Sequence, residues 1–321
     1  MRENDNNRPE RRHGGRIPVR WLLSALLLFA ALAVTAAWAA SKNDLKREEA
    51  SPMPPEQGEN TSDPGTIRWE LPEKITDSSS VKNVLLVGLD RTPEEADAKA
   101  NSILLCSLNG DSDTLTFVSI LSDTLLPVPD HGDERISAVY SLGGAELLSK
   151  TVEQDLGLSV HGCLAAGPEE IGRCAAAAAP LALSLTAEEA GELNAWGGWD
   201  LAEGPCSLDA AQMLRYTGSS QDGVQQAHRQ QRVLAAAFQQ LSGKPVTELY
   251  NLAERELPHI DSDLSRTQVL ELIFTAVSRH MTAAEGLQFP AEGTYTASED
   301  GVPVPDLAEN SRLLRQSLYG K

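Results

Sequence analysis

Three short apolar runs between Val84 and Ile120 constrain the fold most strongly. They are Val84–Val87, Ser102–Leu108 and Leu115–Ile120. A turn cluster, Asn109–Ser112, separates the second run from the third, and this pattern predicts a β-hairpin. Polar residues follow the ends of the runs, and in an α/β sheet this edge is the usual position of a ligand. The sequence therefore predicts three neighbouring central strands with a site at one edge.

The rest of the chain alternates between helical and strand patterns. The predicted helices are Ala145–Asp155, Glu169–Ala179, Ala187–Asn194, Ser207–Arg215, Gln225–Leu241, Val246–Leu252 and Leu264–Arg279. The predicted strands are Val160–Ala165, Leu181–Leu185 and Gly293–Thr296. This alternation predicts an α/β fold of three layers, α/β/α, in which one central mixed sheet has helices on both faces.

The N-terminal region predicts a membrane anchor. Six arginines among residues 1–20 precede an uncharged run, Trp21–Ala40, which is long enough to cross a bilayer. Arginine on the amino side predicts a cytoplasmic tail at 1–20, a transmembrane helix at 21–40 and an extracytoplasmic chain beyond it. Residues 41–80 are rich in Pro, Glu and Ser and predict a disordered stalk, followed by a domain at 81–320. A cleaved signal peptide is the alternative, because Ala37–Ala39 resembles a cleavage site.

Net charge and cysteine content further restrict the functional classes that fit this chain. The formal net charge is −19 in spite of the arginine-rich start. An acidic domain is a poor partner for nucleic acid, whose phosphates need a basic face. The cysteines Cys106, Cys163, Cys174 and Cys206 lack metal-ligand spacing. We expect small buried thiols at Cys106 and Cys174, although the spacing alone does not exclude disulfides.

The order of motifs resembles the LytR-CpsA-Psr family of envelope proteins. The resemblance covers Val81–Gly320, and no single motif carries it alone. The segments that match are Leu86–Arg91, Lys99–Ser102, Ser119–Thr124, Arg135–Tyr140, Gly143–Gly144, Leu201–Asp209, His228–Leu234 and Pro305–Gly320.

This resemblance implies a membrane-anchored domain that binds a polyprenyl-pyrophosphate carrying a glycopolymer and transfers the polymer to peptidoglycan. It implies that Mg²⁺ is the cofactor, and that the cytoplasmic membrane, the lipid carrier and peptidoglycan are the partners. The residues that it assigns are Asp90, Asp123 and Arg229 for catalysis, Arg91, Lys99, Arg135 and Gln230 for substrate binding, and Asp90 with Asn101 for the metal. We expect Asp90, Asn101, Asp123 and Arg229 to converge around one cleft.

Several charged residues of the family pattern are replaced here. Asn101 stands in place of the second metal-binding Asp, Lys99 in place of its neighbouring Arg, and Ser122 in place of another Arg. Thr217–Ser220 and Gln226 replace further arginines. Two hypotheses follow: a divergent transferase with a weakened metal site, or a non-catalytic relative that binds a lipid or glycan as a scaffold.

Structural roles also compete for the same residues. Asp90 and Asp123 also suit turns or helix caps after their strands, and for Asp123 the structural role is favoured. Arg229 and Gln230 have the spacing of a solvated helix face. Trp196 and Trp199, in a Gly-rich loop, either stack on sugar rings or close over the core.

Overall fold

The computed structural model describes residues 67–74, 80–90, 97–218, 223–298 and 300–320. The predicted tail, the run Trp21–Ala40 and most of the predicted stalk lie outside these ranges. None of the described helices is both long and apolar enough to cross a membrane.

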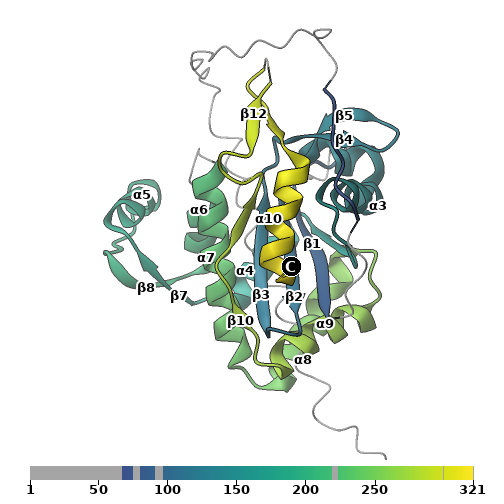
Figure 1. The fold of residues 1–321 in the computed structure, drawn as a ribbon. Coiled ribbons are helices and arrows are strands. Elements are labelled where there is room, and N and C mark those ends of the chain that lie inside the picture. Colours follow the sequence, from purple (N-terminus) through teal and green to yellow (C-terminus); the bar gives the residue numbers. More distant parts are fainter. Residues whose placement is uncertain (1–66, 75–79, 91–96, 219–222, 299, 321) are drawn as a thin grey trace, which may run out of the picture.

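A mixed sheet forms the centre of the domain (Figure 1). Its strands are β1 (Val81–Leu89), β2 (Ala100–Asn109), β3 (Thr114–Ile120), β6 (Cys163–Ala166), β9 (Asp261–Ser262), β10 (Thr282–Ala283) and β11 (Leu287–Phe289). The order is β10-β3-β2-β1-β6-β9, and β11 also pairs with β3. β1, β2 and β3 pair antiparallel, whereas β6 is parallel to β1. The three predicted runs are thus neighbouring central strands, as the sequence predicts.

Side chains of the central strands alternate between two hydrophobic cores. Val84 and Leu86 of β1 belong to one core, and Leu85 and Val87 belong to the other. This alternation follows from the twofold period of a strand. Leu86 and Val118 are fully buried. Both faces of the sheet are therefore covered.

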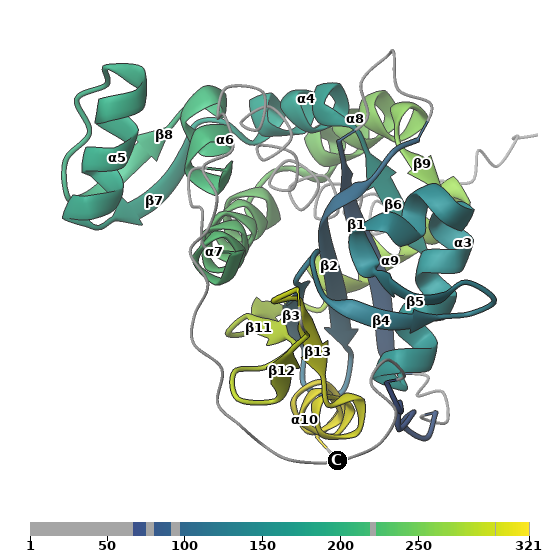
Figure 2. The same cartoon turned by 90° about the horizontal axis from the view of Figure 1, so that it is seen from above.

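Helices form the two outer layers (Figures 1 and 2). α3 (Ile136–Leu156) and α10 (Leu307–Tyr319) contribute to the core that contains Leu85. The core that contains Leu86 is completed by α4 (Pro168–Ala178), α6 (Ala210–Gly218), α7 (Gly223–Ser242), α8 (Val246–Glu256) and α9 (Arg266–Ser278), and a short 3₁₀ helix, η2 (Leu257–His259), follows α8. The predicted three-layer α/β/α arrangement with a central mixed sheet is confirmed.

Three two-stranded ribbons lie outside the central sheet. They are β4 (Leu125–Val128) with β5 (Gly132–Arg135), β7 (Leu181–Leu185) with β8 (Gly204–Leu208), and β12 (Tyr295–Ala297) with β13 (Pro303–Pro305). The prediction that Leu181–Leu185 belongs to the central sheet is wrong, because its partner is β8. The helix predicted from Ser207 starts at Ala210, since Ser207 is paired in that ribbon.

Two helix boundaries also differ from the prediction. α3 begins at Ile136 and is broken at Gly143 and Gly144, whose backbone angles are not helical. α5 (Ala187–Gly197) includes Trp196, which the sequence places in a loop, and ends at Gly198 in the left-handed conformation. Thr186 caps the start of α5: its side chain accepts a hydrogen bond from the Glu189 N–H.

Part of the predicted stalk packs on the domain. Trp69 lies against the core of α3 and α10, and its Nε1 donates to Asp133 at 2.8 Å. Lys74 pairs with Glu153 at 3.4 Å. The described residues 67–74 are therefore in contact with the domain, unlike the structureless segment that the composition predicts.

The cysteines are free thiols, and Cys106, Cys163 and Cys174 are buried. Burial raises the pKa of Cys106 to about 12, so this thiol stays protonated at neutral pH.

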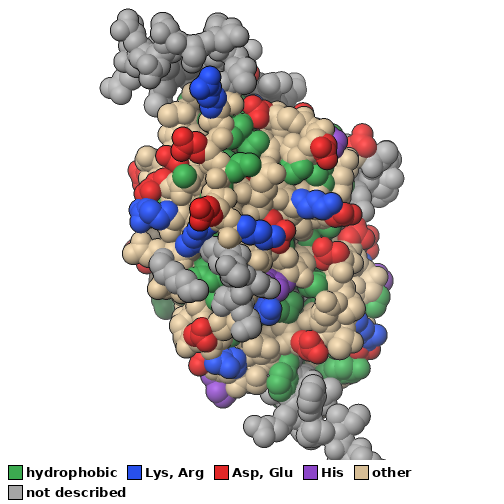
Figure 3. All heavy atoms as spheres, turned by 45° about the vertical axis from the view of Figure 1, so that its right-hand side comes forward, with side chains coloured by type: hydrophobic (Ala, Val, Ile, Leu, Met, Phe, Trp, Pro, Cys, Tyr) green, Lys and Arg blue, Asp and Glu red, His purple; other side chains and the backbone are tan. Residues whose placement is uncertain are grey.

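On the face drawn in Figure 3, acidic and basic side chains are interspersed, and the basic ones do not gather into one patch.

Asp155, near the end of α3, is a buried carboxyl group in an apolar surrounding. It is 0% exposed, and its Oδ1 accepts a hydrogen bond from Gln154 at 3.0 Å. Its Oδ2 has no hydrogen-bond partner among the described residues. Burial raises the pKa of Asp155 to about 7. The folded state therefore holds a proton that the unfolded chain loses near pH 4.

We predict that this group makes the protein less stable as the pH rises from about 4 to about 7. Asp155→Asn should remove this dependence and raise the free energy of unfolding at pH 8 by roughly 2–4 kcal/mol relative to the unmodified chain. Urea denaturation at pH 4 and pH 8 measures the difference. Asp130→Asn, at an exposed turn, is the matched control. Parallel pH curves for the Asp155 variant and the unmodified chain would contradict the prediction.

Candidate functional site

The antiparallel register brings two polar positions from different strands to one edge of the sheet. β1 ends beside the start of β2, because Leu89 pairs with Ala100. β3 ends at the same edge, because Ile120 pairs with Ile103 of β2. Consequently Asn101 at the start of β2 and Asp123 after β3 lie at this edge, where the sequence predicts a site.

A hollow of about 440 Å³ lies at this edge and is called here the strand-edge hollow. Of the predicted site residues, Asn101, Asp123, Arg135 and Gln230 line it. The remaining lining residues are Ser102, Ile103, Ser119, Ile120, Leu121, Ser122, Gly223, Val224, Gln226, Ala227, Asp300, Gly301, Val302 and Pro303. The structure thus brings together four of the predicted residues from four separate segments.

One face of α7 forms a wall of the hollow. Gly223, Gln226, Ala227 and Gln230 line it and follow one another at intervals of three, one and three residues, which is the spacing of a single helix face. Gln230 is 4% exposed, and its Oε1 accepts a hydrogen bond from Ser102 at 3.3 Å. This contact joins the helix to β2.

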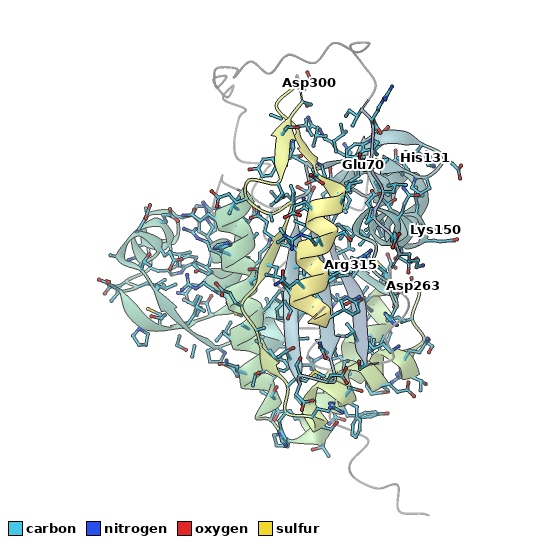
Figure 4. All side chains as sticks on the ribbon, in the orientation of Figure 1. Glu70, His131, Lys150, Asp263, Asp300 and Arg315 are labelled. Carbon is cyan, nitrogen blue, oxygen red and sulfur yellow. The ribbon has the colours of Figure 1, made fainter. Side chains whose placement is uncertain are left out.

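The hairpin of β12 and β13 supplies another wall that the sequence reasoning missed. Its tip contributes Asp300 to Pro303 to the lining, and Figure 4 shows Asp300 at the end of the hairpin. Gly301 has φ +72°, which suits glycine in a turn. The Asp300-Gly301 pair between two short β-prone segments is a hairpin signal that could have identified this wall.

Asp123 and Arg135 form an exposed pair at the rim. The Arg135 Nη1 lies 3.6 Å from the Asp123 Oδ1, and their side chains are 49% and 69% exposed. Such a pair contributes little to stability, and both groups remain accessible to a ligand. Within the described ranges, Arg135 is the only positively charged side chain lining the hollow, beside the carboxylates of Asp123 and Asp300.

Asp90 and Lys99 do not line the hollow. The Asp90 Oδ1 accepts a hydrogen bond from the Lys99 N–H at 2.7 Å, and the Asp90 N–H donates to the Lys99 carbonyl at 3.0 Å. Asp90 therefore closes the connection between β1 and β2, which corresponds to the turn role that the sequence left open. The predicted binding residue Arg91 lies outside the described residues.

Arg229 lies on a different face of α7 from Gln230 and is buried. Its side chain is 2% exposed, its Nη2 lies 2.7 Å from the Glu192 carboxylate, and its Nε lies 3.9 Å from Glu189. Its guanidinium also lies over the Tyr216 ring, 5.3 Å from the centroid. The prediction that Arg229 joins Asn101 and Asp123 in one cleft is therefore wrong. Neighbouring helix residues differ by about 100° in direction, so Arg229 faces α5.

Glu189 of α5 links two arginines of α7. It accepts hydrogen bonds from Arg232 at 2.6 Å and from the Tyr216 hydroxyl at 2.7 Å. Burial alone would raise the pKa of Glu189, but the Thr186 N–H, the Tyr216 hydroxyl and Arg232 outweigh it and lower that pKa. Burial, followed by the hydrogen bond to Glu189, raises the pKa of Tyr216. Thr186 and Glu189 match the capping-box pattern of a helix start, but the contacts of Glu189 and Glu192 with α7 had no recognisable sequence signal.

The described part of the chain contains no group of three or more His, Cys, Asp or Glu side chains placed to hold a metal ion. The hollow nevertheless offers hard oxygen donors, namely the Asn101 amide, the Asp123 carboxylate and several serine hydroxyls. Magnesium sites commonly use one or two carboxylates and take further ligands from water and substrate phosphates. The chemistry of the donors therefore fits Mg²⁺, although Asp90 does not line the hollow.

We predict that Arg229 stabilises the fold, because its side chain is 2% exposed and its removal leaves a cavity beside the Tyr216 ring and takes away the partner of Glu192. Arg229→Ala should lower the free energy of unfolding by about 2–5 kcal/mol. Arg135→Ala, in the exposed pair, is the control and should cost about 0–1 kcal/mol. Chemical denaturation followed by circular dichroism measures both. Equal losses of unfolding free energy in the two variants would show that the buried network stabilises the fold no more than the exposed pair does.

Parts of the chain are similar to known proteins. The model of the LytR_cpsA_psr family matches residues 29–164. The polyisoprenyl-teichoic acid–peptidoglycan teichoic acid transferase TagU of Oceanobacillus iheyensis is 24% identical over 217 residues, which are 63% of this chain and 66% of TagU. The regulatory protein MsrR of Staphylococcus aureus is 27% identical over 77 residues, which are 24% of this chain and 23% of MsrR. The match thus spans just under two thirds of TagU and about a quarter of MsrR.

A solved structure shares the fold. It is the LytR-CPS2A-psr family protein YwtF (TagT) with bound octaprenyl pyrophosphate lipid, with a TM-score of 0.57 and 20% identity. The superposition covers 77% of this chain and 94% of YwtF. The motif order, the mixed sheet and these matches agree: the chain shares the fold of the solved structure and, over residues 29–164, is similar to the LytR-CpsA-Psr family.

Proposed function

We propose that this protein binds a polyprenyl-pyrophosphate-linked glycopolymer at the strand-edge hollow and transfers the polymer to peptidoglycan. The observation that carries the proposal is the convergence of Asn101, Asp123, Arg135 and Gln230 on one accessible hollow. TagU is named as a transferase of teichoic acid to peptidoglycan, and the YwtF structure holds octaprenyl pyrophosphate. These relatives support a donor of the same class.

The hollow suits a polar head group rather than a lipid tail. Arg135 offers paired N–H donors that match phosphate oxygens, and the Gln230 amide offers a further polar contact. Asp123 at the rim is suited to accept a proton from an acceptor hydroxyl. Asn101 and Asp123 are the residues that would hold Mg²⁺, and bound Mg²⁺ would neutralise charge that develops on the leaving phosphate.

The prenyl tail requires a rearrangement of the apolar layer. Between the sheet and α9, an apolar cavity of about 20 Å³ is lined by side chains that include Val84, Cys106 and Ile273. This volume admits roughly one water molecule. We therefore infer that α9 separates from the sheet when a tail enters.

A second candidate function is binding without transfer. The observation that favours it is the ion pairing of Arg229 with Glu192 and Glu189, which balances the charge of this guanidinium within the protein and away from the hollow. Asn101 and Ser122 also replace charged residues of the family pattern. A relative of this kind would hold the lipid-linked polymer as a scaffold.

Two measurements separate these candidates. Mass spectrometry of an organic extract of the purified chain should detect polyprenyl phosphate under both, and its absence would contradict both. We predict weak Mg²⁺-dependent transfer from a lipid-linked donor by the unmodified chain. Asn101→Asp with Ser122→Arg should raise it about tenfold or more, because a restored charged hydrogen bond contributes roughly 1.5–3 kcal/mol.

The control adds the same side-chain types elsewhere. Ser112→Arg with Asn251→Asp, both at exposed positions, should leave transfer unchanged. If the unmodified chain transfers polymer as fast as the variant with Asn101→Asp and Ser122→Arg, then the residues present at these two positions do not weaken the site. If neither protein transfers while both retain lipid, the scaffold function is favoured.

We also propose that the protein is a single-pass membrane protein with a cytoplasmic N-terminus. The arginine-rich segment before Trp21–Ala40 supports this topology. Alkaline phosphatase, which needs disulfides formed outside the cytoplasm, should be active when fused after Lys321. The same enzyme fused after Arg20 should be inactive. An inactive fusion after Lys321, with an active cytoplasmic reporter there, would overturn this topology.

A further inference from the structure

The segment of residues 181–209 forms a lobe beside the main body of the domain. It contains β7, α5 and β8, and both views show α5 and this ribbon projecting past α6 (Figures 1 and 2). Arg229 and Arg232 of α7 hold the lobe through Glu189 and Glu192. The tryptophan pair of the lobe takes no part in the strand-edge hollow.

The loop that follows α5 is held in one conformation by hydrogen bonds and close packing. The Asn194 side chain forms two hydrogen bonds with Leu201, accepting from its N–H and donating to its carbonyl, both at 2.8 Å. Gly198 takes the left-handed conformation at φ +65°. A Cβ atom on Gly197 would lie 2.6 Å from the Trp199 ring, so glycine allows this ring to lie directly on the backbone. The loop therefore fixes the positions of its aromatic residues.

The two tryptophans have different surroundings. Trp199 is half-buried and packs against the core, whereas Trp196 is 57% exposed. Their ring centroids lie 5.6 Å apart with an angle of 43° between the planes. The Arg215 guanidinium lies 4.6 Å from the centre of the Trp196 ring. A large indole surface is thus held in place yet left open to solvent.

The charge of the lobe limits what this surface binds. Residues 181–209 contain six Asp and Glu residues and no Lys, Arg or His. Three arginines of α6 and α7 contact the lobe and offset half of this charge, and the remaining acidic excess disfavours phosphate-rich polymers and anionic lipid head groups. A neutral ligand with many hydroxyl groups has no such penalty.

We propose that Trp196, supported by Trp199 and Arg215, is a binding platform for a neutral sugar ring. One face of a sugar ring carries C–H groups with partial positive charge, and these are attracted to the negative face of an indole. The Arg215 guanidinium beside the ring is a hydrogen-bond donor, which suits sugar hydroxyls. This site binds a neutral oligosaccharide whether or not the hollow transfers a polymer.

The test is calorimetric titration of the full chain in detergent with chitohexaose, a neutral oligosaccharide. Calorimetry measures heat, so its signal does not depend on the indole ring that the Trp196 variants remove. We expect saturable binding with a Kd on the order of 1 mM. Trp196→Ala should weaken it roughly fivefold or more, and Trp196→Phe, which keeps an aromatic face, should stay within about twofold. Tyr295→Ala, at an aromatic residue that is 39% exposed elsewhere, should have no effect.

The outcomes decide the proposal. Absence of saturable binding, or equal binding by the unmodified chain and Trp196→Ala, overturns it. Titration with oligolysine tests a cationic partner, which the acidic lobe would also attract. Binding of oligolysine without binding of chitohexaose assigns the surface to that partner and overturns the proposal. Unchanged circular dichroism of Trp196→Ala verifies that its loss of binding is not a loss of fold.

Discussion

The antiparallel register of β1, β2 and β3 is the constraint on which the rest of the structure depends. It places the end of β1, the start of β2 and the end of β3 at one edge. It also assigns Leu86 to one core and Leu85 to the other. A slip of one residue in any of these strands would exchange the side chains of the two cores and move Asn101 and Asp123 relative to each other. The position of the hollow and the composition of the two cores therefore both follow from this register.

The electrostatics of the hollow follow from which side chains reach it. Arg135 is the only cation among its described lining residues, and Asp123 and Asp300 lie on the same lining. The buried Arg229 is attracted to Glu192 instead, at 2.7 Å. A pyrophosphate in the hollow would thus depend on Arg135 and on added cations for its charge balance. This balance explains why transfer and simple retention of a lipid carrier both remain consistent with the geometry.

The sequence predicted the layers and the edge of the site, because a two-residue period and a turn cluster are local signals. Asn101, Asp123, Arg135 and Gln230 were predicted from motif order, and they do meet. The convergence of Arg229 was predicted wrongly, because its partners Glu189 and Glu192 lie about 40 residues away and gave no local signal. The ribbon of β7 and β8 was missed for a similar reason: pairing between strands depends on tertiary context.

The two faces of α7 have different evolutionary consequences. One face lines the hollow through Gln226 and Gln230, and another holds the acidic lobe through Arg229 and Arg232. Substitutions that change the chemistry of the first face leave the ion pairs of the second intact. Selection on chemistry is thereby separated from selection on stability within a single helix. The replacement of a family arginine by Gln226 on the first face therefore removes none of the ion pairs that hold the lobe.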